Sequence, residues 1–424
     1  MTIQLHDKAK EAIVRHLVEG LPRIQVRNGK YPENFGLFIS AYFADQALPS
    51  GDIRTQWESY IDELPLVQFT TDYIKRELSE NGKWVEAEGL TPLFDLGVFS
   101  NPENLAVEIV EKFCTIPWQF RLALPLHDRL FPDDFLMDRE YPLGDGQVST
   151  PNLFSEAKFP LSHDNEDRAL RAKSGGLLRI GNAEWNAHLP HFVTHEEGLI
   201  QIDGGGERVE AATYRLESVI GLGLALRLFH YRFQHDTPPN RPSWFVHKAK
   251  QDNWEFWTRF DLNEDTAETL RHISTFKFED KYPEDRRRPW LQSAIAKIDE
   301  VLRHPQSNSV VLAAKWLFDS HKKSDHALTY VRLMTVLEIL LGGEFDHSRA
   351  SLSEIISNRL AYLVGKNYDE RSKILSEFKE IYSRRSRIVH RGKHRLKTPE
   401  MVMMNRLRSL CEKAIYEEAN ALVA

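Results

Sequence analysis

The last third of the chain carries apolar residues at helical spacing with only short breaks, and this feature constrains the fold most. Apolar side chains recur every three to four residues in one segment after another, which is typical of amphipathic helices. We predict helices over residues 290–303, 308–320, 325–341, 351–364, 368 to about 389, and 399–424. Six helices joined by short turns predict an all-α helical bundle.

Residues at the expected helix ends support these boundaries. Asp325 is a favoured N-cap for the helix predicted at 325–341, and Gly342 is a typical residue at the C-terminal end of such a helix. Ser351 and Glu354 have the spacing of a capping box, in which each side chain bonds to the backbone of the other residue. Pro399 suits the first turn of the last helix.

Residues 1–282 have a different texture, with most of the proline and glycine and short stretches rich in aromatic and β-branched residues. These stretches predict strands within residues 83–99 (a pair around Gly89), 176–182, 191–203 and 243–262. Helical spacing predicts helices at residues 3–19, 104–113 and 213–231. We therefore predict a multi-domain chain, with an N-terminal α+β region over residues 1–282, of one or two subdomains, and a C-terminal all-α bundle over residues 283–424.

Composition excludes several classes of protein. A hydrophobic content of 42% argues against wholesale disorder, and the apolar run from Val219 to Phe229 is shorter than the roughly 20 residues that span a bilayer. The N-terminal residues carry no secretory apolar core. Cys114 and Cys411 show neither a pairing nor a metal-site pattern. We expect a cytoplasmic protein that has no membrane partner.

The segment from Tyr382 to Arg395 holds six Lys or Arg, two His and no acid, although the chain has a formal net charge of −7. One interpretation is a solvated charge run, because cations at a helix C-terminus gain about 0.3–1 kcal/mol each from the helix dipole. The other interpretation is a functional site. Four residues separate Arg385 from His390, and a slight unwinding at the helix end would direct both side chains into one cleft.

The stretch "RRSRIVHRG" resembles the R-x4-6-H signature of HEPN domains (higher eukaryotes and prokaryotes nucleotide-binding), in the Apea-like form R-S-[KR]-[IL]-V-H-G. The stretches "AAKWLFDS", "ALTYVRLMTVLEILLGG" and "SLSEIISNRLAYLVG" precede it in the order of that family, so the resemblance covers residues 290–424. Two positions depart from the pattern. Ser386 stands where many HEPN ribonucleases have Asn, Asp or His, and Arg391 separates the histidine from Gly392.

The resemblance implies a metal-independent endoribonuclease in which a ribose 2′-hydroxyl attacks the adjacent phosphate and leaves a 2′,3′-cyclic phosphate. His390 suits proton transfer near neutral pH, and Arg385 suits the stabilisation of charge on phosphate, so neither catalytic role needs a metal or another cofactor. The family also implies a homodimer through the bundle. By this resemblance, the protein would be an antiphage defence effector or a toxin. Residues 1–282 would be a sensor or regulatory region that responds to a phage-derived or nucleotide trigger.

Other residues of the segment have subsidiary roles in this hypothesis. The surrounding cations are expected to contact RNA phosphates, which makes binding sensitive to salt: Arg384, Arg387, Arg391, Lys393 and Arg395. Glu338 lies on a mostly apolar helix and needs a partner, so we expect a structural salt bridge to an arginine of the motif helix. Ser386 is an auxiliary residue. The alternative function is a non-catalytic RNA-binding, nucleotide-binding or partner-docking module.

Three further clusters are interpreted without a catalytic role. His188, His191 and His195 are close in sequence, but Pro190 prevents a helical arrangement and a strand would separate the first histidine from the other two, so we expect no metal site. The glycine-rich residues 203–208 lack the spacing of a nucleotide-binding loop and predict a hairpin turn. The tryptophans at positions 244, 254 and 257 are expected to pack in the core rather than to stack on bases.

Overall fold

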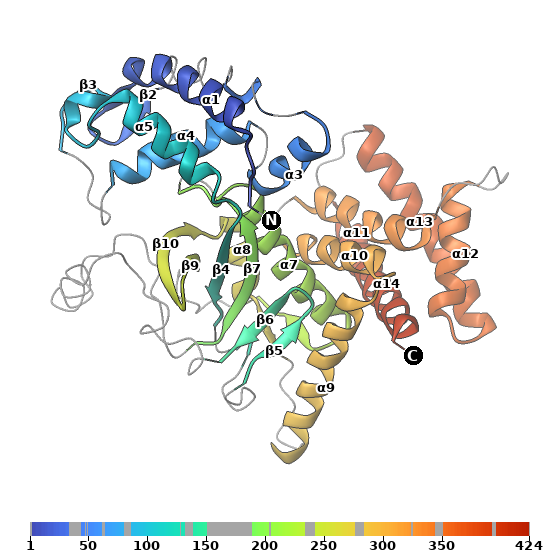
Figure 1. Cartoon of the computed structure of the whole chain (residues 1–424). Helices are drawn as coiled ribbons and strands as arrows, with labels where there is room; N and C mark the ends of the chain where they lie inside the picture. Colours follow the sequence, from blue (N-terminus) through green and yellow to red (C-terminus); the bar gives the residue numbers. More distant parts are fainter. Residues whose placement is uncertain are drawn as a thin grey trace.

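Figure 1 shows the computed structural model of the chain. It describes residues 2–33, 44–46, 48, 50–61, 64–79, 86–127, 129–131, 139–150, 189–202, 205–233, 242–275, 284–323, 325–343, 351–391 and 396–423. Within these ranges, an N-terminal α+β region precedes a C-terminal region of helices, as the sequence predicts. No helix among the described residues has the length and apolar content needed to cross a membrane.

The first part of the chain builds its own small core. Helices α1 (Asp7–Gly20), α3 (Asp52–Ile61), α4 (Pro65–Glu77) and α5 (Pro102–Phe113) enclose buried side chains that include Leu17, Phe69 and Phe113. An antiparallel sheet flanks them, with β1 (Gln25–Arg27) between β2 (Tyr31–Glu33) and β3 (Leu90–Pro92).

The prediction of two paired strands around Gly89 is wrong for the residues that the structure describes. Residues 86–88 form no strand, and β3 pairs with β1 from the other end of the region instead. Asn28 accounts for the difference, because its side chain accepts a hydrogen bond from the backbone N–H of Gly89 at 3.0 Å and its own N–H donates to the Gly89 carbonyl. These bonds join two segments far apart in sequence, which a local pattern cannot reveal.

A six-stranded antiparallel sheet follows, in the order β10-β9-β4-β7-β6-β5. Its strands are β4 (Trp118–Pro125), β5 (Tyr141–Leu143), β6 (Gly146–Ser149), β7 (His191–Gly198), β9 (Ser243–Lys250) and β10 (Asn253–Asp261). The strands predicted within residues 191–203 and 243–262 are therefore confirmed, and that predicted at 176–182 lies outside the described residues. The small strands β8 (Phe229–Tyr231) and β11 (Ile273–Thr275) pair separately, next to helix α8 (Glu264–Arg271).

Helix α7 (Gly206–Ala225) lies between the six-stranded sheet and the bundle (Figure 1). The hairpin turn predicted at residues 203–208 is wrong where it is described, because Gly205 is the N-cap of this helix. Gly205 has φ 74°, a left-handed conformation that glycine adopts without steric cost. Further along, Gly221 packs directly against the backbone of α10: a Cβ at this position would lie 1.9 Å from the Ala314 carbonyl oxygen.

The six predicted helices of the bundle are confirmed within a few residues, except at the first boundary. They are α9 (Glu284–Arg303), α10 (Asn308–Asp319), α11 (His326–Leu341), α12 (Leu352–Val364), α13 (Tyr368–Arg391) and α14 (Thr398–Leu422). Asp325 caps α11 by accepting from the Leu328 N–H at 2.8 Å, and Ser351 with Glu354 forms the predicted capping box of α12. Helix α9 begins six residues before the predicted start at residue 290 and includes Pro289.

One hydrophobic core joins the six-stranded sheet, α7 and the bundle. Buried residues such as Leu122 on β4, Leu216 on α7 and Leu317 on α10 belong to the same cluster, as does Leu407 on α14. The predicted boundary between residues 282 and 283 falls in a stretch outside the described residues, and the described segments on either side of it share this core.

Buried charges also connect α7 to α10, in a group that we call the seam. Glu217 of α7 is 2.7 Å from the Lys322 Nζ and 3.9 Å from the Lys315 Nζ. Asp319 pairs with the same two lysines. Glu217 also accepts a hydrogen bond from the Thr266 hydroxyl at 2.6 Å. Glu217 and Asp319 are almost fully buried and have little contact with water. Their negative charges are therefore stabilised by the two lysines.

Candidate functional site

The predicted motif lies on α13, which runs without a break through both Arg385 and His390. Asn367 begins this helix by accepting a hydrogen bond from the Glu370 N–H at 2.9 Å. The expected unwinding between the two motif residues is therefore wrong. A helix turns about 100° per residue, so residues 385 and 390 leave its axis about 140° apart. The backbone of one chain does not set them on the same side of α13.

Arg385 is held against α11 by the partner that the sequence predicted. Its Nη2 lies 3.3 Å from the Oε1 of Glu338, with both side chains about three-quarters buried. The guanidinium also lies over the Tyr382 ring, 6.0 Å from its centroid. The predicted salt bridge to the motif helix is confirmed, and it ties Arg385 to the interior of the bundle.

Arg384 likewise points toward carboxylates. Its guanidinium is 3.4 Å from Glu400 of α14 and 3.8 Å from Glu380 of α13. Next to it, the Tyr330 hydroxyl donates to the Ile381 carbonyl at 3.0 Å, and burial raises the pKa of this tyrosine. Arg384 was expected to contact RNA, but its ion pair with Glu400 gives it a role in joining α13 to α14.

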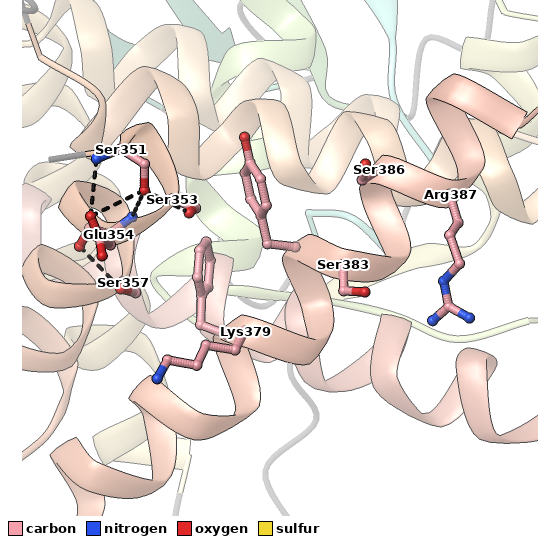
Figure 2. Close-up of a pocket in the computed structure, with 10 residues that line it drawn as sticks. Ser351, Ser353, Glu354, Ser357, Lys379, Ser383, Ser386 and Arg387 are labelled. Atoms are coloured by element: carbon pink, nitrogen blue, oxygen red, sulfur yellow. Dashed lines mark hydrogen bonds between the residues drawn. The ribbon is translucent and has the colours of Figure 1, made fainter.

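An open cleft of about 750 Å³ lies between the start of α12 and the middle of α13. Figure 2 shows four side chains of the α12 end, Ser351 to Ser357, on one side of it and the α13 residues along the other. Lys379 extends toward the α12 side, and Arg387 extends at the opposite end (Figure 2). The cleft is lined by Ser351, Ser353, Glu354, Ser357, Phe378, Lys379, Tyr382, Ser383, Ser386 and Arg387.

Of the residues proposed from sequence, Ser386 and Arg387 line this cleft, whereas Arg384 and Arg385 do not. The backbone of His390 is part of α13, one helical turn beyond Ser386 and on the same side of the helix. The side chains at positions 390 and 391 lie outside the described residues. Lys393 and Arg395 lie outside them entirely.

Sequence analysis missed most of the cleft residues. On α13, Lys379, Tyr382, Ser383 and Ser386 follow the spacing of one helical face that continues to residue 390, and this pattern was available in the sequence. The serines of α12 gave no comparable signal. They reach the cleft only because α12 packs beside α13, and a single sequence does not reveal which helices pack together.

His191 and His195, the described members of the histidine cluster, lie in different environments on β7. His191 is buried on β7, where burial and the neighbouring His247 lower its pKa to about 3, while His195 is exposed on the same strand. His188 lies outside the described residues, and no group of metal-ligating side chains is found within the part that is described. The neutral form of His191 is therefore the stable one inside the sheet.

Two of the three tryptophans pack in the interior as predicted. Trp244 and Trp257 are almost fully buried, and the Trp257 Nε1 donates to the Ile200 carbonyl at 2.7 Å. The Nζ of Lys248 lies 3.2 Å from the centroid of the Trp118 ring, and burial lowers its pKa to about 7. This cluster joins the N-terminal core to the six-stranded sheet.

Comparisons with family models, with curated proteins and with solved structures found no match for the chain. The resemblance to HEPN domains therefore depends on the residues of this sequence.

Proposed function

We propose that the protein is a metal-independent endoribonuclease of the HEPN type. The observation that carries the proposal is the R-x4-H pair on α13, the fifth of six helices, after sequence stretches that resemble those of the family in the same order. A cleft with two cations next to that pair supports it. RNA is the substrate class, and the N-terminal region regulates the activity in response to a phage-derived or nucleotide trigger, as an antiphage defence effector or toxin would require.

In the proposed reaction the imidazole of His390 accepts the proton of a ribose 2′-hydroxyl. The 2′-oxygen forms a bond to the adjacent phosphorus, and the bond from phosphorus to the 5′-oxygen breaks. A protonated imidazole donates a proton to that leaving oxygen, so the products are a 2′,3′-cyclic phosphate and a 5′-hydroxyl. Arg385 stabilises the negative charge that develops on the phosphate oxygens.

The angle of about 140° between residues 385 and 390 favours an active site shared by two copies of the chain. A two-fold axis beside α13 would bring the arginine of one copy to the histidine of the other. We propose a homodimer through the bundle on this ground. Glu338 then keeps Arg385 in a fixed orientation.

The test is to incubate the purified protein with total cellular RNA in EDTA and to map the new RNA ends. We expect fragments with cyclic phosphate ends, and we expect Arg385→Ala or His390→Ala to lower the cleavage rate at least about 100-fold. The exposed residues Lys373 and His326 provide matched controls, because Lys373→Ala and His326→Ala each remove a similar group away from the cleft. Cleavage that persists in the Arg385→Ala/His390→Ala double variant would refute the assignment.

The second candidate is a non-catalytic RNA-binding, nucleotide-binding or partner-docking module. The ion pair between Arg385 and Glu338 favours this candidate. An arginine whose role is to stabilise the fold through a carboxylate does not need to contact a substrate. RNA binding in EDTA without any new ends would support this candidate over the nuclease.

A further inference from the structure

We propose that the cleft between α12 and α13 binds a single-stranded segment of RNA, with one base on the Tyr382 ring and phosphates at Lys379 and Arg387. The inference rests on the proposed function in taking RNA as the ligand, and it adds where the strand lies. It also assigns binding to Lys379 and Tyr382, which lie outside the R-x4-H motif. Four properties of the cleft carry it.

The first property is unpaired positive charge. Among the described residues, no carboxylate pairs with Lys379 or Arg387, whereas their neighbours Arg384 and Arg385 both have carboxylate partners. Glu354 is the one acid among the described residues that line the cleft, so these residues carry two positive charges and one negative. A chain of formal charge −7 thus presents net positive charge at this surface. Such a groove attracts a phosphate backbone.

The second property is the spacing of the two cations. Lys379 and Arg387 are eight residues apart on α13, which corresponds to about 12 Å along the helix axis. Lys379 extends toward the α12 side, and Arg387 lies at the far end of the α13 segment (Figure 2). Two cations at this separation can contact phosphates about two nucleotides apart in an extended strand, and Tyr382 lies between them in the sequence of α13.

The third property is the aromatic residue itself. Tyr382 is half-buried in the middle of the cleft, with Phe378 next to it at a centroid distance of 6.3 Å. Arg385 lies over the tyrosine ring, so the pair formed with Glu338 also fixes the ring in place. A fixed aromatic ring beside a cationic groove stacks with any unpaired base. A duplex keeps its bases stacked inside, which is why we infer a single strand.

The fourth property is a set of hydroxyl groups without partners. Serine inside a helix commonly bonds to the carbonyl one turn earlier. The hydroxyls of Ser383 and Ser386 make no such bond, nor any other within the described part of the chain. Across the cleft, the hydroxyls of Ser351 and Ser353 bond to each other, and that of Ser351 also bonds to Glu354. The unpartnered hydroxyls among the described lining residues that this property concerns are therefore those of Ser383 and Ser386. These groups can donate to phosphate oxygens and to the polar edge of a base.

The test measures binding by the full chain in EDTA, with His390→Ala to prevent cleavage. The probe is a fluorescein-labelled 12-nucleotide single-stranded RNA of mixed sequence, followed by fluorescence anisotropy at several salt concentrations. We expect Lys379→Gln/Arg387→Gln to weaken binding at least about tenfold at low salt. We also expect the slope of log K against log salt to fall by about 1.4, because each lost phosphate contact contributes about 0.7 for a single strand.

Three variants make the result specific. Tyr382→Leu is expected to weaken binding about 5- to 150-fold, and Tyr382→Phe, which keeps the ring, to preserve it. The control Lys366→Gln/Lys373→Gln removes the same charge from exposed positions at the start of α13 and just before it, and should leave affinity and salt slope unchanged. Retained thermal stability of the cleft variants would show that the loss of binding is not a loss of folding.

The outcomes separate this inference from the proposed function. If the natural sequence cleaves RNA while the cleft variants bind and cleave as it does, the inference is wrong and the nuclease assignment stands. If the cleft variants lose binding but the natural sequence never cleaves, the inference stands and the nuclease assignment fails. Tighter binding of a duplex than of the single strand, or no RNA binding, would overturn the inference.

Discussion

The seam between α7 and α10 and the cleft between α12 and α13 use the same kinds of charged side chain in opposite ways. At the seam, Lys315 and Lys322 are each within 4 Å of both Glu217 and Asp319. At the cleft, Lys379 and Arg387 have no acidic partner among the described residues. The seam lysines are paired with buried acids and stabilise the fold. The cleft cations are not paired with an acid among the described residues, so in our proposal their charge can bind a ligand.

The arginines of the motif lie between these extremes. Arg385 is paired like a seam lysine, but its partner Glu338 is about one quarter exposed, whereas Glu217 and Asp319 are almost fully buried. It therefore joins the interior of the bundle to the edge of the cleft through the Tyr382 ring. The comparison predicts that stability depends most on the seam, less on Arg385 and least on the cleft cations.

The largest effect is expected from breaking the seam. Glu217→Ala leaves two lysines near a single buried acid, and removing one partner of a buried pair costs about 3–5 kcal/mol of unfolding free energy. Urea denaturation followed by circular dichroism measures the loss. Glu380→Ala is the control, because Glu380 is an exposed acid that pairs with Arg384 at 3.8 Å, and it should change stability by less than about 1 kcal/mol. Equal effects of the two variants would remove the distinction between seam and surface.

The dependence of stability on pH also distinguishes the interior from the cleft. Buried groups that titrate between pH 6.5 and 3 make folding depend on pH, whereas Lys379 and Arg387 keep their charge over this range. The pKa of His191 is lowered from 6.5 to about 3 by burial, so the unfolded chain binds a proton that the folded chain resists. Stability should therefore fall as the pH drops from 6.5 toward 3, by up to about 1.4 kcal/mol per pH unit from this residue.

Denaturation at a series of pH values tests this prediction. His191→Leu should flatten the curve between pH 6.5 and 3, whereas His326→Leu, which changes a histidine at an exposed position, should leave its slope unchanged. Asp45 has the opposite sign: burial raises its pKa to about 6, so it adds stability as the pH falls through 6. Because Asp45 is present in all three chains, its contribution cancels in the comparison. Identical slopes for His191→Leu and the natural sequence would contradict the assignment.

A smaller effect is expected from the pair that Arg385 forms with Glu338, at the edge of the cleft. Glu338→Gln keeps the shape of the side chain and removes the charge that faces Arg385. Because both side chains are about one quarter exposed, water screens the pair and the loss should be less than about 1 kcal/mol. Thermal denaturation measures it, with Glu377→Gln, which removes the partner of Arg406, as the matched control. A loss above about 3 kcal/mol would show that the pair of Arg385 and Glu338 behaves like the buried pairs of the seam, and would contradict the comparison.

The helices of the bundle could be predicted because their signals are local. Asp325, Ser351 and Glu354 act within one turn of the helices that they begin, so the sequence contains the whole interaction. Glu338 could be paired with the motif helix for a related reason, since an acid on an apolar helix needs a cation nearby. In these cases the physical requirement is visible in a single sequence.

The features that were not predicted depend on which segments meet in space. The order of the six strands places β4 between β7 and β9, and no pattern within those strands specifies that order. Ser351 and Ser383 face one cleft although they are far apart in sequence. Gly205 was assigned to a turn because glycine favours turns and helix starts alike. Local composition does not distinguish these outcomes.

The contact between Gly221 and Ala314 has a consequence for any signal that arises in the α+β region. The two helices touch through main-chain atoms, so no side chain between them can absorb a change of position. A shift of α7 relative to the sheet must therefore displace α10. A molecule that bound beside the sheet would have a mechanical connection to α10 and, through α11, to the two helices that line the cleft.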